Sequence, residues 1–156
     1  MNEAARAVDD TDRELLHLLA TDGRLPHAEL ARRVNLSRPA VHHRLRRLEA
    51  DGVIRGYRAD LDWPAIGYPI TAFVLIRAVG PTAQATADSI LSFQEPNAFV
   101  DECYRVAGDW SLLIRARAST TQTMAKLIDR VRALPNVNWS QTAVTLSALH
   151  ETPSGG

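Results

Sequence analysis

The chain has 156 residues, with 18 basic and 18 acidic side chains and one cysteine, Cys103. A chain of this length forms one or two small domains that bury their own core, without a metal ion or a disulfide to hold them. No apolar run approaches the roughly 20 residues that cross a bilayer, and the N-terminus lacks the apolar segment of a secretory signal. The composition excludes collagen-like, coiled-coil and wholly disordered proteins, so we expect a globular cytoplasmic protein without a membrane partner.

The net charge of zero hides an uneven distribution of charge along the chain. Between Arg24 and Arg58, nine arginines stand against only three acidic residues, a local excess of six positive charges. Such an excess on one short segment is typical of a surface that docks on a polyanion. A run of charges can also be the solvated face of a helix, so the positions of the arginines must distinguish between these two interpretations.

The segment before residue 35 predicts two short helices. The first has Asp10 or Thr11 as its N-cap and ends at Gly23, and the second has Pro26 in its first turn. Each carries an apolar stripe at helical spacing, formed by Leu15, Leu16 and Leu19 in the first helix and by Ala28, Leu30, Ala31 and Val34 in the second.

A third helix follows the tight turn predicted at Asn35-Leu36-Ser37. Ser37 is a natural N-cap, and Pro39 suits the first turn. The helix ends near Gly52, and Val53 to Leu61 predicts an extended ribbon. The spacing i, i+4, i+7 buries Val41, Leu45 and Leu48.

Two helices joined by a short turn, the second rich in arginine, fit the helix-turn-helix geometry in which the second helix enters the major groove of DNA. Beside Ser37 and Pro39 at its start, the residues placed closest to base edges are Arg38, His42 and His43. Adjacent histidines diverge by about 100° on a helix, so we expect no metal ion there. The arginines that suit phosphates, which position a protein without specifying sequence, are Arg32, Arg33, Arg44, Arg46, Arg47, Arg55 and Arg58.

Residues 63–69 hold two prolines and a glycine, and they predict a linker between a first domain at 1–62 and a second at 70–150, with a flexible tail at 151–156. The second domain repeats itself at an offset of 38 residues, because Leu75-Ile76-Arg77-Ala78 recurs as Leu113-Ile114-Arg115-Ala116. Each copy predicts a strand and then an amphipathic helix. The apolar positions of these helices are Ala83, Ala87, Ile90 and Leu91 in the first and Met124, Leu127, Ile128, Val131 and Leu134 in the second.

Each of these helices is followed by a further strand, Phe99 to Val106 and Val137 to Leu149. The order β-α-β-β-α-β is that of a split βαβ sandwich, in which helices cover one face of an antiparallel sheet. Trp110 to Ala118 alternates between an apolar face for the helices and a more polar face. The second face has no helix left to cover it and carries Leu113 and Tyr104, so we expect it to pair with a copy of itself.

Several short motifs lie along both predicted domains: Asp12-Arg13-Glu14-Leu15-Leu16, Asp22-Gly23-Arg24, Gly52-Val53-Ile54, Gly67-Tyr68, Glu102-Cys103-Tyr104, Gly108-Asp109-Trp110 and Leu134-Pro135-Asn136-Val137. With these motifs the chain resembles the Lrp/AsnC family of bacterial and archaeal transcription regulators from about Asp9 to His150. The resemblance implies an α+β protein with a winged-type helix-turn-helix domain and a βαββαβ ferredoxin-like (RAM) domain. It also implies a homodimer built on the sheets, often assembled into tetramers or octamers, that binds an amino acid or similar metabolite near subunit interfaces.

By the same resemblance, the effector loop between the second and third strands maps onto Gly108, Asp109, Trp110 and Ser111, and a later Thr-x-Thr element appears as Ser140-Gln141-Thr142. An α-amino group needs an acidic partner, which Asp109 offers, and the hydroxyls of Ser140 and Thr142 suit a carboxylate. Many family members have an acid in place of Ser111, so the resemblance leaves the effector unidentified. The alternative for this loop is a plain tight hairpin in which Gly108 supplies the turn.

Two other functions, an enzyme and an architectural protein, compete with a DNA-binding regulator. An enzyme is disfavoured because no nucleophile elbow, phosphate loop or metal-ligand array occurs, and no cofactor is expected. Asp101 and Glu102 are neighbours on a strand and should point to opposite faces, while Cys103 suits a small core residue. Some haem-biosynthesis decarboxylases resemble the same two-domain family, but an enzyme needs no arginine-rich third helix. An architectural DNA-binding protein would share the basic residues, but its affinity for a specific site would be little higher than its affinity for random DNA.

Overall fold

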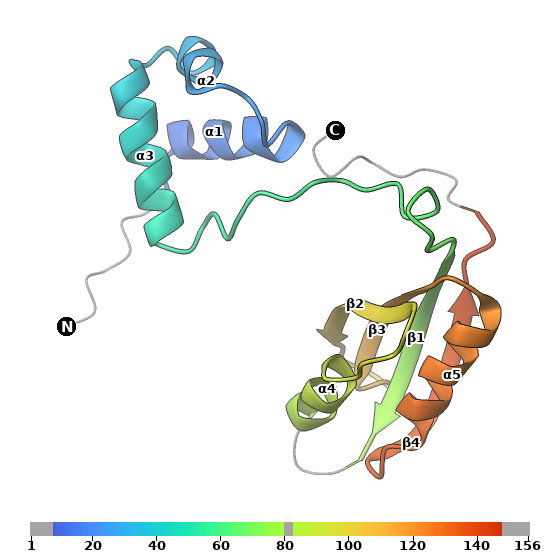
Figure 1. Ribbon diagram of the computed structural model, residues 1–156. Coiled ribbons are helices and arrows are strands. Elements are labelled where there is room, and N and C mark those ends of the chain that lie inside the picture. Colours follow the sequence, from blue (N-terminus) through green and yellow to red (C-terminus); the bar gives the residue numbers. More distant parts are fainter. Residues whose placement is uncertain (1–7, 80–82, 148–156) are drawn as a thin grey trace. The chain divides into compact units, whose positions relative to one another are not determined.

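The computed structural model describes residues 8–79 and 83–147, and the chain forms two compact units divided between Leu61 and Asp62. The first unit holds three helices, and the second has the expected β-α-β-β-α-β order (Figure 1), so the α+β class is confirmed. The elements are α1 (Asp10–Thr21), α2 (His27–Arg33), α3 (Arg38–Ala50), β1 (Ile70–Ala78), α4 (Ala83–Leu91), β2 (Ala98–Arg105), β3 (Leu112–Ala118), α5 (Thr121–Arg132) and β4 (Val137–Val144).

The three helices of the first unit surround one apolar core. The N-cap of α1 is Asp9 rather than the expected Asp10 or Thr11, because the Asp9 side chain accepts a hydrogen bond from the backbone N–H of Asp12 at 2.8 Å, and the backbone N–H of Asp9 donates in return to the Asp12 side chain at 3.1 Å. Ala28 is exposed, although its spacing assigned it to the apolar side of α2. Fully or nearly fully buried are Leu15, Leu30, Ala31, Val34, Val41, Leu45 and Leu48.

The turn between α2 and α3 follows the sequence prediction. Asn35 takes a left-handed conformation with φ of 52°, and the N–H of Leu36 returns to the carbonyl of Ala31 at 2.9 Å, which closes the C-terminus of α2. The hydroxyl of Ser37 then accepts from the N–H of Ala40 at 3.3 Å and caps α3. This pair of caps fixes the direction in which α3 leaves the turn.

After α3 the chain reverses at Gly52, whose φ of +69° suits a residue without a side chain. Residues 53–62 form no strand, so the ribbon expected over Val53 to Leu61 has no partner strand in the part of the chain that the structure describes. One side-chain contact ties it back to α3: the hydroxyl of Tyr57 donates to Glu49 at 3.0 Å. Burial, together with this bond to a carboxylate, raises the pKa of Tyr57.

The second unit is an antiparallel sheet in the order β2-β3-β1-β4, with α4 and α5 on one face (Figure 1). Leu91 is half exposed instead of buried, because it lies at the last position of α4. β4 ends at Val144, earlier than expected, while Leu149 and the tail at 151–156 lie outside the described residues. The core between sheet and helices is built on Val74, Ile76, Ile90, Leu112, Ile114, Met124, Leu127 and Val131.

The other face of the sheet has no helix among the described residues. Leu75, Leu113 and Tyr104 lie side by side across β1, β3 and β2, as expected, and Tyr104 is 52% exposed. Residues 63–69, expected as a linker, include a turn at 63–67, and Trp63 and Tyr68 pack against Phe99 at ring distances of 5.5 and 5.1 Å. These aromatic contacts attach the segment to the second unit.

One expectation about β2 was wrong. Asp101 and Glu102 do not diverge, because the register shifts between Val100 and Glu102 and the bulge turns both carboxylates toward Arg115. The guanidinium of Arg115 donates to Asp101 at 3.1 Å and to Glu102 at 2.6 Å. Asp101 also accepts a hydrogen bond from Nε of Arg117 at 2.7 Å. Both carboxylates therefore form ion pairs with arginines and do not pair with each other.

Candidate DNA-binding surface and effector cavity

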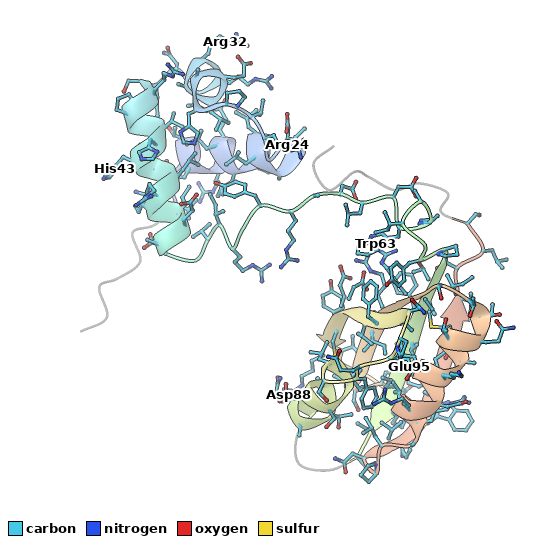
Figure 2. The ribbon with its side chains drawn as sticks, in the orientation of Figure 1. Arg24, Arg32, His43, Trp63, Asp88 and Glu95 are labelled. Atoms are coloured by element: carbon cyan, nitrogen blue, oxygen red, sulfur yellow. The ribbon has the colours of Figure 1, made fainter. Side chains whose placement is uncertain are left out.

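One face of α3 is free of contacts with the core of the first unit. Val41, Leu45 and Leu48 are buried on the opposite side, which leaves this face to solvent. Figure 2 shows His43 on the side of α3 that is turned away from α1 and α2. The capped first turn of α3 therefore presents donors and acceptors outward, and the exposed residues are Ser37, Arg38, Pro39, His42, His43 and Arg46. The sequence predicted this face correctly.

His42 also meets the second helix. Its ring lies 5.6 Å from that of His27, the first residue of α2. Among residues 8–79 and 83–147 no group of three metal-ligating side chains occurs. The two rings therefore form a contact between helices beside the exposed face, and both remain exposed to solvent.

Two of the arginines expected at phosphates are directed elsewhere. Arg44 and Arg47 bind Asp9 and Asp12 at the start of α1, and their side chains are only 27% and 20% exposed. The bond from Arg44, with the backbone N–H of Asp12, lowers the pKa of Asp9, while the same ion pairs raise the pKa of Arg44. Sequence spacing placed both arginines at the flank of α3 but gave no sign of the acids that they meet.

Both arginines of α2 form ion pairs with the same carboxylate. Arg32 and Arg33 donate to Glu29 at 2.7 Å each, and these bonds lower the pKa of Glu29 to about 2. Both arginines stay on the surface. Arg55 and Arg58, on the segment after α3, are exposed as well, and neither has a carboxylate partner among the described residues.

In the second unit, the loop between β2 and β3 is fixed to the end of β1. The hydroxyl of Ser111 accepts from the N–H of Ala78 at 3.1 Å and lies 3.2 Å from its carbonyl, to which it donates. Arg77 donates to the carbonyl of Asp109 at 2.8 Å, and its guanidinium lies 5.4 Å from the centre of the Trp110 ring. Gly108 has φ of +105°, which suits a glycine, and residues 108–109 form a bend in this loop.

A cavity lies beside this loop, and its volume of about 520 Å³ is within the usual range for small-molecule sites. Trp110 gives it an aromatic wall. Burial raises the pKa of the Cys103 thiol, with a smaller effect of Asp88, so this thiol is not an activated nucleophile. Lining residues from α4, β2 and the loop include Gln84, Leu91, Cys103, Arg105, Gly108 and Ser111.

The structure does not gather the whole predicted effector set in this cavity. Asp109 does not line it, and its side chain faces solvent. Ser140 belongs to a smaller cavity of about 290 Å³ with Arg132, which donates to its hydroxyl at 2.9 Å. Thr142 is part of β4, and its hydroxyl is buried without a partner in the described chain. Sequence reasoning missed Gln84 and Arg105, because nothing in their local pattern sets them apart.

Comparison with known proteins supports the reading of both units. The winged helix-turn-helix DNA-binding model matches residues 8–55, and the Lrp/AsnC ligand binding domain model matches residues 71–154. The chain belongs to the Lrp/AsnC family. Its members are DNA-binding transcription regulators with an effector-binding domain rather than enzymes, so the regulator is the reading that holds.

Relatives match this Lrp/AsnC chain along nearly its full length. The HTH-type transcriptional regulator LrpA of Mycobacterium tuberculosis is 39% identical over 92% of both chains. The proline dehydrogenase transcriptional activator of Rhodobacter capsulatus is 33% identical, covering 94% of this chain and 96% of its own. A solved structure of a feast or famine regulatory protein from M. tuberculosis, complexed with L-methionine, matches with a TM-score of 0.82 and 35% identity over 93% of this chain and 96% of that one.

None of the described helices has the length and apolar character required to cross a membrane.

Proposed function

We propose that this Lrp/AsnC regulator binds pseudo-palindromic DNA by placing α3 from each of two protomers in successive major grooves. The exposed first turns of α3 carry the proposal, because Arg38, His42 and His43 are held outward by a capped helix and meet no carboxylate in the described chain. Arg46 and Arg55 are exposed, and in this proposal they contact the flanking phosphates. Half-sites then lie about one helical turn, or a multiple of it, apart.

The effector in this proposal is an amino acid with an apolar side chain, bound in the cavity beside the loop of Gly108 to Ser111. Trp110 and Leu91 offer an apolar wall, and Arg105 is the cationic group that suits a carboxylate. The relative solved in complex with L-methionine makes amino acids the first ligands to test. Ser140 and Thr142 belong to this site only if a second protomer brings them there.

A homodimer follows from the open face of the sheet. Phe73, Leu75, Leu113 and Tyr104 form an apolar strip across three strands that no described helix covers. Pairing two such strips buries apolar surface and brings two copies of the first unit to one DNA site. Larger assemblies, such as tetramers or octamers, use other surfaces. The DNA partner places this activity in the cytoplasm.

The full-length protein tests the proposal in two steps. Selection of binding sites from a randomised duplex pool should enrich an inverted repeat, and footprints on the enriched duplex are then repeated with each of the twenty amino acids. We expect an apolar amino acid to raise the melting temperature of the protein and to change its footprint. Arg105→Ala should abolish this response, whereas Arg132→Ala, in the other cavity, should retain it. A pool without enrichment rejects the DNA proposal, and the reverse pattern of variants rejects the location of the effector.

A further inference from the structure

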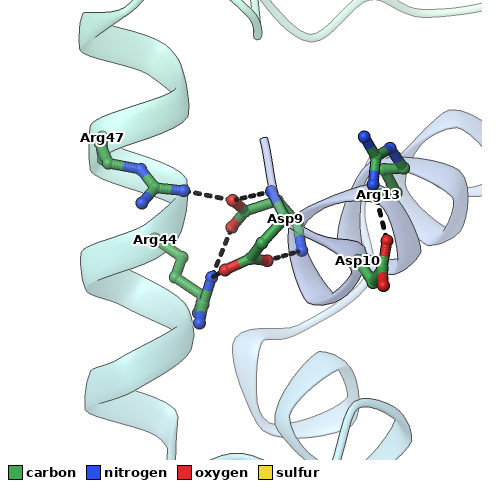
Figure 3. A network of polar contacts seen from close by, with 6 residues as sticks. Asp9, Asp10, Arg13, Arg44 and Arg47 are labelled. Atoms are coloured by element: carbon green, nitrogen blue, oxygen red, sulfur yellow. Dashed lines mark hydrogen bonds and ion pairs between the residues drawn. The ribbon is translucent and has the colours of Figure 1, made fainter. Parts of the chain in front are cut away.

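A four-residue ion-pair network joins the start of α1 to the flank of α3 (Figure 3). Arg44 lies at the centre, because its Nη1 donates to Asp9 Oδ2 at 2.6 Å and to Asp12 Oδ1 at 2.8 Å. Nη2 of Arg47 donates to the other carboxylate oxygen, Oδ2, of Asp12. Residues 32 to 35 positions apart in sequence are thus joined by charge-assisted hydrogen bonds between the start of α1 and α3.

The two acids also hold the first turn of α1. Asp9 and Asp12 cap each other's backbone N–H groups, so contacts within the first turn of α1 already hold both side chains in place. The Asp12 side chain is completely buried. A buried carboxylate is costly unless it is paired, so its two arginines are required partners and not incidental ones.

The arginines of α3 therefore fall into two groups. Arg44 and Arg47 are one turn apart, between the buried stripe and the exposed face, and their guanidinium groups are bound to buried or half-buried acid. Nε of Arg47 is itself buried, with no hydrogen-bond acceptor in the described chain. Arg46, between them in sequence, is exposed and has no carboxylate partner among the described residues.

We propose that Arg44 and Arg47 are positioning residues, which through Asp12 and Asp9 set the rotation of α3 so that Arg38 and His42 face base edges. In this proposal they contact no phosphate, in contrast to the role that their charge suggested. This inference rests on the proposed DNA-binding role of α3. A tilt of α3 on α1 would move its first turn, where base edges are read, while leaving the exposed Arg46 free to find a phosphate.

The test compares two duplexes of equal length: the one that the wild-type chain enriches from a random pool, and a scrambled version. Arg47→Gln should lose affinity roughly tenfold on the enriched duplex, about the effect of one lost base contact, and little on the scrambled one. Its salt slope on the scrambled duplex should match that of the wild type. The matched control, Arg46→Gln, should lose affinity on both duplexes. It should also reduce the magnitude of the slope of log K against log salt by about 0.9 for each DNA-binding unit.

Asp12→Asn gives the sharpest contrast. Removing a negative charge beside a DNA-binding helix should strengthen binding to every duplex if only charge mattered. The positioning role predicts the opposite on the enriched duplex, a loss of roughly tenfold, with scrambled binding unchanged or stronger. If Asp12→Asn fails to fold, Asp9→Asn takes its place, because asparagine keeps the cap and loses only the ion pair with Arg44.

The outcomes separate the inference from the proposed function. Equal losses on both duplexes for Arg47→Gln, with a lower salt slope, would make Arg47 a phosphate contact and overturn the inference alone. Stronger binding of Asp12→Asn, or of the folded Asp9→Asn substitute, to both duplexes would do the same. A wild-type chain that enriches no sequence would overturn the proposed function and this inference together.

Discussion

The salt dependence of DNA binding follows from which arginines the fold leaves available. Within the first unit, four arginines on or after α3 are exposed and have no carboxylate partner among the described residues: Arg38, Arg46, Arg55 and Arg58. Two heads then bring about eight positive charges to the duplex, and at about 0.9 per neutralised phosphate the slope of log K against log salt is about −7. If all eight arginines of the sequence prediction bound DNA, the slope would be about −14.

Arg46→Ala should change the slope of log K against log salt without disturbing the core, because the Arg46 side chain is exposed. Loss of one charge on each head should change the slope from about −7 to about −5. The matched control is Arg13→Ala, which removes an exposed arginine already paired with Asp10 on α1 and should leave the slope unchanged.

The assay is fluorescence anisotropy of a labelled duplex, titrated with protein between about 50 and 200 mM salt. Sedimentation at each salt concentration confirms that the assembly stays the same. A wild-type slope near −14, or an Arg46→Ala slope equal to that of the wild type, would refute the division of arginines into free and paired groups.

Three further predictions concern recognition and stability. Arg38→Ala should reduce discrimination at one base position by about 1 to 3 kcal/mol, measured by competition between single-base variants of the enriched duplex. Leu45→Ala should lower the free energy of unfolding of the first unit by about 2 to 5 kcal/mol in urea titrations, because Leu45 is only 2% exposed and its truncation leaves a cavity. Glu29 has a pKa lowered from 4.5 to about 2, so its stabilising ion pairs are present above pH 4.5 and are lost as the pH falls toward 2. Glu29→Gln should flatten the pH dependence of stability in that window, and Glu14→Gln should not.

The local features of the first unit could be predicted from sequence because they depend on spacing within one helix. Ser37 caps α3, and Val41, Leu45 and Leu48 are buried, as the period of 3.6 residues requires. The partners of Arg44 could not be predicted in this way. Asp9 and Asp12 meet it only because the turns between the helices bring α1 against α3, and no local pattern encodes that approach.

In the second unit, the internal repeat predicted the order of strands and helices, and alternation predicted that Leu113 and Tyr104 share the open face. The bulge in β2 could not be predicted, since it inserts one residue into an otherwise regular alternation and so turns Asp101 and Glu102 toward the same arginine. The effector residues remain a prediction. Family resemblance names them by position, whereas the cavity beside the loop depends on packing of α4 that sequence spacing does not describe.

Protection of guanine N7 from dimethyl sulfate tests most directly whether α3 lies in the major groove, because N7 is exposed there. On the enriched duplex, we expect two protected patches about 10 base pairs apart, centre to centre, or a multiple of that spacing. Both should disappear in a folded Arg38→Ala, Arg46→Ala double variant. Protection that survives in this variant, or wild-type binding with no major-groove protection, would contradict the placement of α3 on DNA.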